Sequence, residues 1–313
     1  MLGKTAGGLF WMFRYLERAE NTTRLIDAGF RIALTRPRSE NDEWSSMIAA
    51  AGVTTGYLEK HDDYDAMRVI DFLLRDPSNP SSVLSIMESA RNNAKMVRTA
   101  LTREVWEATN EAWMGTKDAL ARPIKHRNLI EVLGITRQHA ALVRAALHGT
   151  MLRNDIYDFS RIGTFLERAD NTARILDVKY YVLLPSISHV GSALDNIQWE
   201  MILRSVSAQR SYRWLNGSDI NARGIADFLI LDGRMPRSLA FCYTKIIDNL
   251  GYLEKDYKDR HDCHDQAQKL SAKLHGKSID QILDYGLHEF ISAFVQENTA
   301  VAQQVESDYR FYG

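Results

Sequence analysis

The chain has 313 residues, and its 39 Lys and Arg residues nearly balance its 40 Asp and Glu residues, leaving a net charge of −1. This length allows two domains and a large hydrophobic core. The charge lacks the basic excess typical of nucleic-acid-binding proteins, and no apolar run reaches the ~18 residues of a membrane span. We therefore expect no nucleic-acid partner and no membrane insertion.

The start of the chain lacks the apolar region of a signal peptide, and Cys242 and Cys263 alone predict no disulfide framework. We therefore expect a cytoplasmic protein.

Apolar residues recur with a helical period through most of the chain, and alternation typical of strands is nearly absent. In chain order, the predicted helices span residues 6–35, 41–52, 64–75, 81–114, 124–149, 155–183, 193–214, 219–230, 237–258 and 279–310. Ser278 and Gln281 form a capping-box pattern for the last of these. The predicted fold class is all-α, with antiparallel helices packed as bundles.

The chain contains an internal repeat. Residues 16–27 and 166–177 are identical at eight of twelve positions, at an offset of 150. Phe72-Leu73 matches Phe228-Leu229, and residues 76–82 match residues 232–238, at an offset of 156. Repeats of this kind outrank other sequence cues to a fold. We predict one domain, 1–313, built from a first repeat at 1–150 and a second at 151–313, packed together without a flexible linker.

The repeated segment is a helix with a polar stripe. Glu17, Asn21 and Arg24 lie within about 60° of one another on a helical wheel, with Arg18 at one edge of the stripe. The second copy presents Glu167, Asn171 and Arg174 in the same way, with Arg168 next to them.

Three interpretations of this stripe are open: a solvated face, a buried Glu–Arg–Asn network, or a surface that binds a ligand or partner. Exposed charges are energetically replaceable. Here the polar residues are nearly unchanged between the copies, while Leu and Ile exchange. This pattern disfavours a purely solvated face and makes the stripe the main candidate for binding or for an interface.

Other candidates for chemistry are few. Arg204 and Ser205, near Tyr212-Arg213, have side chains suited to a carboxylate or phosphate ligand. Residues 261–265, His-Asp-Cys-His-Asp, resemble a zinc-binding cluster, but the first half has no equivalent. We interpret this segment as polar surface and predict no metal site. The chain has no nucleotide-binding glycine loop and no nucleophile elbow, so we predict no cofactor.

Residues 9–22, 149–153 and 165–174, together with 90–98, 104–110 and 199–213, resemble the bacterial alpha-E domain family. That family is all-helical, is named for a Glu-Arg motif, and was formerly a domain of unknown function. The resemblance covers essentially the whole chain.

The resemblance implies partners, because genes of this family commonly neighbour those of circularly permuted ATP-grasp ligases and transglutaminase-like proteins. The leading hypothesis is therefore a non-catalytic accessory or scaffold protein that works with such an amide ligase in peptide synthesis or modification. One alternative is an enzyme that binds a peptide-like or carboxylate substrate in a polar cleft lined by Glu, Arg and Asn. A second is a stand-alone structural homo-oligomer.

Overall fold

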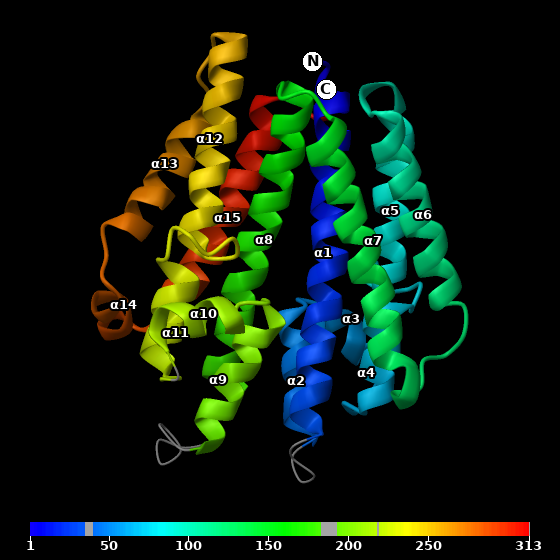
Figure 1. Cartoon of the computed structure of the whole chain (residues 1–313), viewed down its shortest axis with the longest axis vertical. Helices are drawn as coiled ribbons and strands as arrows, with labels where there is room; N and C mark the ends of the chain where they lie inside the picture. The colour runs from blue at the N-terminus through cyan, green and yellow to red at the C-terminus, as the bar shows by residue number, and fades with distance from the viewer. Residues whose placement is uncertain (35–39, 183–192, 218, 313) are drawn as a thin grey trace.

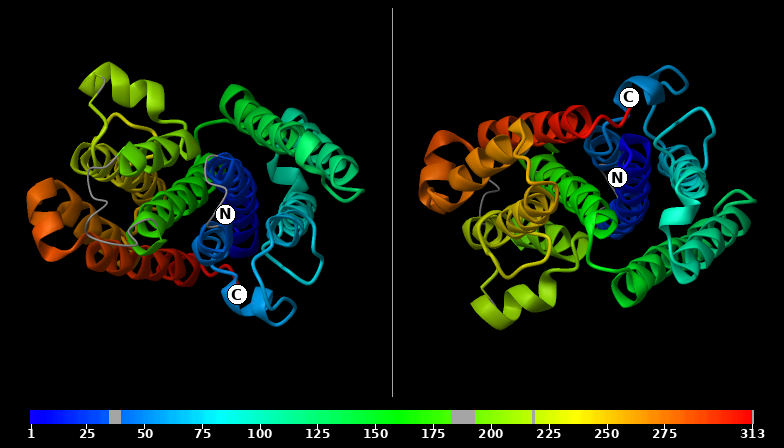
Figure 2. Two further views of the ribbon diagram at one scale, coloured as in Figure 1. Left: turned by 90° about the horizontal axis from the view of Figure 1, so that it is seen from below. Right: turned by 90° about the horizontal axis from the view of Figure 1, so that it is seen from above.

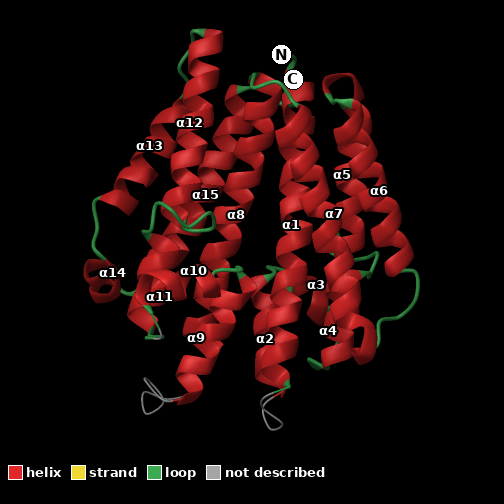
Figure 3. Ribbon diagram, viewed as in Figure 1, coloured by secondary structure: helices red, strands yellow, loops and turns green. Residues whose placement is uncertain are grey.

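A computed structural model describes residues 1–34, 40–182, 193–217 and 219–312. In these residues all regular structure is helical and no strand occurs (Figure 3), which confirms the all-α fold. The helices of the first half are α1 (Gly3–Ala33), α2 (Glu40–Ala50), α3 (Thr54–Leu58), α4 (Ala66–Leu74), α5 (Val83–Met96), α6 (Arg103–Ala119) and α7 (Leu129–Thr150). Those of the second half are α8 (Asp155–Val182), α9 (Ala193–Ser205), α10 (Gln209–Asn216), α11 (Ala222–Ile230), α12 (Leu239–Tyr257), α13 (Asp262–His275), α14 (Ile279–Tyr285) and α15 (Leu287–Asp308).

Two long helices, α1 and α8, form the centre of the molecule and run side by side in the same direction (Figures 1 and 2). Helices α5 and α7 pack on α1, whereas α12 and α15 pack on α8. The helix that follows each central helix crosses over, because α2 contacts α8 and α9 contacts α1. We call the contact between α1 and α8 the seam.

The two halves share one continuous hydrophobic core. Trp44 and Trp199, at similar places in the two repeats, are both buried, as expected for core residues. The central helices approach closely at Gly163, where an added Cβ would lie 2.3 Å from the backbone oxygen of Phe10. The duplication itself stays a prediction, although Ser82 and Ser238, which the repeat aligns, both cap helices.

Three predicted long helices are wrong because each is broken by a turn. The 81–114 helix is interrupted before Arg103, where Thr102 caps α6 by accepting a hydrogen bond from Val105. The 193–214 helix is interrupted at Ser207, whose φ is 55°. The 279–310 helix is interrupted at Gly286, with φ 110°. The helical period continues across each break because both pieces pack against the same core, so periodicity alone does not locate the turns.

Smaller differences concern the helix ends and two additional helices. The Ser278–Gln281 capping box is present, but it begins the short helix α14 and not the last helix. Helices α3 and α13 were not predicted. Thr35 and Leu183, the final residues of two predicted helices, lie outside the described residues.

Candidate functional site

The Glu-Arg motifs of the two central helices pair with each other across the seam. Arg168 donates from Nε to Glu17 Oε1 at 2.9 Å and from Nη2 to Oε2 at 2.8 Å. Arg18 makes the same bidentate contact with Glu167: its Nε donates to Oε1 at 2.5 Å and its Nη2 to Oε2 at 3.0 Å. Each motif therefore supplies the carboxylate for the other motif's arginine, a reciprocity that resembles a twofold interface between two copies.

These carboxylates are buried. Glu17 is 1% exposed and Glu167 is 4% exposed, so the interpretation as a solvated face is wrong for both. A buried charge is tolerated only when it is paired and hydrogen-bonded. Glu167 meets this condition with a second arginine, Arg14, whose Nε lies 3.0 Å from Oε2.

On one side of the seam, a buried arginine from the segment before α12 completes the network. Arg237 Nη1 donates to Glu17 Oε1 at 3.0 Å and to Asn21 Oδ1 at 2.8 Å, and its Nη2 donates to Glu20 Oε1 at 3.0 Å. Glu20 also accepts hydrogen bonds from Arg24, at 2.7 and 3.0 Å, and from Arg144 of α7. We call this cluster the Arg237 site.

The arginines keep the seam carboxylates ionised. Burial alone would raise the pKa of Glu17, but Arg168 and Arg237 outweigh it and hold that pKa far below the usual value. Glu167 behaves in the same way: Arg18 and Arg14 overcome the effect of burial and lower its pKa to about 2. Burial lowers the pKa of Arg237 to about 10, which still leaves it protonated at neutral pH.

The opposite side of the seam is hollow. A polar cavity of about 260 Å³, which we call the seam pocket, is lined by Arg18, Asn21, Thr22, Leu25, Ala50, Ala51, Gly52, Ser81, Glu167, Asp170, Asn171 and Arg174. Arg174 Nε donates to Asp170 Oδ2 at 2.6 Å. Within the described part of the chain, Asn21 Nδ2 and Asn171 Oδ1 are buried atoms without a hydrogen-bond partner.

The structure thus brings five predicted candidates together in the seam pocket: Arg18, Asn21, Glu167, Asn171 and Arg174. Glu17, Arg168 and Arg24 belong to the Arg237 site, where Arg24 also contacts the hydroxyl of Ser207.

The other two candidates lie elsewhere. Arg204 pairs with Glu200 within α9 at 3.2 Å, and Ser205 donates its hydroxyl hydrogen to the backbone oxygen of Ile202. Neither of these contacts belongs to the seam.

Sequence reasoning missed the arginines outside the motif that complete the seam, above all Arg237 and Arg144. One signal was available for Arg237. It lies in the matched block 232–238, where the first copy has Ser81. A single buried arginine distinguishes the two copies at this position.

The 261–265 segment differs from its predicted surface role. Cys263 and His264 are buried, at 0% and 2% exposure, because they begin α13, which packs on α12 and α15. The interpretation as polar surface is wrong for these two residues. Across the described ranges, no group of three or more His, Cys, Asp or Glu side chains is arranged to hold a metal ion.

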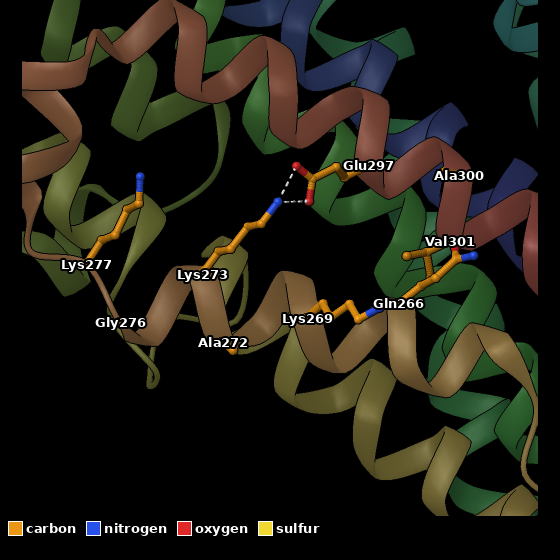
Figure 4. A pocket seen from close by; sticks show the side chains of 9 residues that line it. All are labelled: Gln266, Lys269, Ala272, Lys273, Gly276, Lys277, Glu297, Ala300 and Val301. Atoms are coloured by element: carbon orange, nitrogen blue, oxygen red, sulfur yellow. Dashed lines mark hydrogen bonds and ion pairs between the residues drawn. The ribbon is translucent and has the colours of Figure 1, made fainter.

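A second recess lies between α13 and α15 (Figure 4). This groove of about 680 Å³ is lined by Gln266, Lys269, Ala272, Lys273, Gly276, Lys277, Glu297, Ala300 and Val301. Three lysines follow one another along α13 and just beyond it, and Lys273 Nζ lies 2.6 and 2.8 Å from the two carboxylate oxygens of Glu297. Lys269 and Lys277 have no such carboxylate partner among the described residues.

Within the described residues, no helix has an apolar stretch that could cross a bilayer. Comparison with solved structures finds no significant match.

Comparison with curated proteins finds three mycobacterial relatives. One is an uncharacterized protein of Mycobacterium bovis and two are uncharacterized proteins of Mycobacterium tuberculosis. Each is 24% identical over 269 residues, which cover 80% of this chain and 29% of the relative. The matched region thus spans less than a third of the curated relatives' length.

A family model provides the assignment. The model named Alpha-E, described as a predicted alpha-helical domain with a conserved ER motif, matches residues 1–309. Glu-Arg pairs occur in this chain at 17–18 and 167–168, where the central helices meet. The chain therefore belongs to the Alpha-E family.

Proposed function

We propose that this protein is a non-catalytic helical accessory protein of an amide-ligase system that makes or modifies peptides in the cytoplasm. The observation that supports this proposal most directly is the state of the seam carboxylates. A general acid or base works best when its pKa lies near the operating pH. Glu17 and Glu167 are instead held ionised by arginines, with pKa values far below neutrality. This arrangement suits the rigid centre of a scaffold.

The partner in this proposal is a circularly permuted ATP-grasp ligase, with a transglutaminase-like protein as a further member of the system. The comparisons support association with other protein segments. In the mycobacterial relatives, the matched region is only 29% of a longer chain. A region that is one part of a longer chain there is suited to contact with other domains.

The docking surface in this proposal is the groove between α13 and α15. Its lining includes the apolar residues Ala272, Ala300 and Val301. It also includes Lys269 and Lys277, which have no carboxylate partner among the groove residues. A groove lined by apolar residues and lysines complements an amphipathic helix that carries acidic residues beside its apolar face. We assign such a helix of the ligase as the occupant.

The test is co-purification of this protein with the ATP-grasp protein encoded in the same genome. Reversing the charges of these two lysines, Lys269→Glu together with Lys277→Glu, is expected to weaken the complex by at least about tenfold. The matched control is Lys95→Glu together with Lys117→Glu, which reverses two exposed charges on α5 and α6. The absence of a complex at micromolar concentrations of both proteins would refute direct docking, and equal losses in both double variants would refute the groove.

A second candidate function is an enzyme that acts on a peptide-like or carboxylate substrate. The seam pocket favours it, because a polar cavity lined by Asn21 and Asn171, each with one amide atom that has no partner among the described residues, is suited to a small ligand. Glu167→Gln, which alters the glutamate that lines the pocket, separates the two functions. Under the enzyme hypothesis the reconstituted system loses activity at temperatures where the variant is still folded. Under the scaffold hypothesis activity is lost only as the variant unfolds.

A third candidate is a stand-alone homo-oligomer. Helix α10 exposes Trp214 at 81% and Leu215 at 48%, an apolar pair suited to self-association. Sedimentation of the purified protein tests this candidate. A monomer at micromolar concentration would exclude the homo-oligomer, whereas an oligomer that dissociates when Trp214→Ser is introduced would support it.

A further inference from the structure

The seam pocket occupies the place that, in the other repeat, is filled by Arg237. The two repeats align Ser81 with Arg237, since residues 76–82 match residues 232–238. Both residues directly precede a capping serine, Ser82 for α5 and Ser238 for α12. Arg237 reaches into the seam and is 7% exposed, whereas Ser81 is too short to do so and instead lines the pocket.

The groups that hold Arg237 have counterparts in the pocket wall. Arg237 donates to Glu17, Glu20 and Asn21. At an offset of 150 these positions are Glu167, Asp170 and Asn171, and all three line the seam pocket. The pocket therefore repeats the acceptor set of the Arg237 site, but this chain places no arginine where Arg237 would correspond, since Ser81 stands there.

The acceptors in the pocket have unused capacity. Asn21 Oδ1 accepts a hydrogen bond from Arg237 at 2.8 Å, but its counterpart Asn171 Oδ1 has no partner among the described residues. Asn21, which also lines the cavity and is only 2% exposed, has its Nδ2 without a partner among the described residues. A buried polar group left unpaired carries a free-energy penalty that a matching ligand removes.

The charges of the two sites also correspond. Besides Arg237 itself, the Arg237 site holds two carboxylates, Glu17 and Glu20, and three arginines, Arg24, Arg144 and Arg168. The seam pocket and its ion pairs hold two carboxylates, Glu167 and Asp170, and three arginines, Arg14, Arg18 and Arg174. The Arg237 site accommodates the guanidinium of Arg237 in addition to these two carboxylates and three arginines. Because the seam pocket has the same set of charges, it can accommodate an additional guanidinium as well.

From this correspondence we infer that the seam pocket binds a guanidinium group of a ligand. The ligand is free arginine or an arginine side chain of a peptide. The planar fork of the guanidinium donates to Asn171 Oδ1 and to the carboxylates of Asp170 and Glu167. Asn21 Nδ2 is available to a carbonyl oxygen of the same ligand. A volume of about 260 Å³ limits the bound part to roughly one amino acid.

Isothermal titration of the purified protein tests this inference with four probes. These are L-arginine, L-citrulline (isosteric but neutral), L-lysine (cationic but without the planar fork), and the end-blocked tripeptide Gly-Arg-Gly. Arginine or the tripeptide is expected to bind at least about tenfold more tightly than citrulline and lysine, as charge-assisted forked hydrogen bonds require. Binding of arginine alone identifies a free amino acid as the ligand, and binding of the tripeptide identifies a peptide side chain.

Two variants locate the site. Asn171→Leu removes the unpaired acceptor and is expected to weaken binding by about tenfold or more. Ser81→Arg supplies the guanidinium from within the chain, as Arg237 does in the other repeat, and is expected to abolish binding while the protein stays folded. The matched control is Ala121→Arg, at an exposed residue just after the C-terminal end of α6, and it is expected to keep wild-type binding.

Three results would overturn the inference: no binding of arginine and tripeptide, equal binding of citrulline, or undiminished binding to the Ser81→Arg variant. The measurement uses this protein alone, so it does not depend on the proposed ligase partnership. Loss of the ligase complex and loss of arginine binding are separate outcomes, and each proposal can fail without the other.

Discussion

The two motif glutamates occupy equivalent positions in the sequence, yet the structure predicts that they contribute unequally to stability. Glu17 accepts two hydrogen bonds from Arg168 and one from Arg237. The side chains of these arginines are only 11% and 8% exposed. Glu17→Gln keeps the shape of the side chain but leaves both guanidinium groups without their main counter-charge. Stranding a buried charge in this way typically costs ~3–5 kcal/mol, and we expect a loss in that range.

Glu167→Gln leaves one of its two arginines, Arg18, in a milder environment, whereas the side chain of the other, Arg14, is 12% exposed. The side chain of Arg18 is 30% exposed and can be solvated. Asp170 also lies close enough to Arg18 to favour its charged form. Water and a second carboxylate therefore replace part of what is lost, and we expect a cost of about 1–3 kcal/mol. The structure thus predicts that the Glu17 variant is less stable than the Glu167 variant by at least ~1 kcal/mol.

Urea unfolding at pH 7, with the free energy of unfolding extrapolated to water, measures both variants against the wild type. Glu17→Gln combined with Arg237→Met supplies a further check, because removing the stranded charge recovers part of the loss if burial is its cause. Equal losses at the two positions, or losses below ~0.5 kcal/mol at both, would refute the reasoning from burial.

Two further predictions concern packing and pH. Gly163→Ala is expected to destabilise the protein by about 2–3 kcal/mol, because its Cβ would lie 2.3 Å from the backbone oxygen of Phe10. Gly134→Ala in α7 adds a Cβ that has no neighbouring atom within 4 Å, and is expected to stabilise the protein by ~0.5–1 kcal/mol. Thermal unfolding distinguishes the two variants. Similar melting temperatures would argue against close helix contact at the seam. Burial, with Asp256 and Asp155 nearby, raises the pKa of Asp158 to about 7, so its contribution to stability is greatest below pH 4 and falls as the pH rises to 7. Asp158→Asn is expected to remove about 2 kcal/mol of this pH dependence, and unfolding curves that keep the wild-type dependence would contradict the prediction.

The pairing of the repeated motifs could be anticipated from the sequence only in part. Between the two copies of the repeat, most polar residues of the stripe are identical, whereas Leu and Ile exchange. This difference indicated that the polar residues of the Glu-Arg stripe do more than contact solvent. The sequence did not specify that Glu17 pairs with Arg168 and not with an arginine of its own helix. That choice depends on α1 and α8 running parallel in the register that brings Gly163 to Phe10, which is a property of the tertiary packing.

The helices themselves were predictable where one amphipathic period fills a whole element, as in α1, α7 and α8. Errors arose where two helices share a period and a short non-α-helical segment separates them, at residues 97–102, 206–208 and 286. Helix α13 was missed for a different reason. Cys263 and His264 look polar in sequence, but His264 is buried with Nε2 3.1 Å from the backbone oxygen of Leu250.

The reciprocal seam also explains why one side can be filled and the other left open. The arginine of each motif pairs with the carboxylate of the other motif: Arg168 with Glu17, and Arg18 with Glu167. Each side of the seam therefore has an ion pair that needs no further residue. Arg237 is then an addition to one side, and Ser81 leaves the equivalent volume open on the other without stranding a charge. If the open side served no ligand, a large apolar residue at position 81 would fill it at little cost. Ser81→Met is therefore expected to leave stability unchanged or raised while it abolishes arginine binding, a combination that packing alone would not produce.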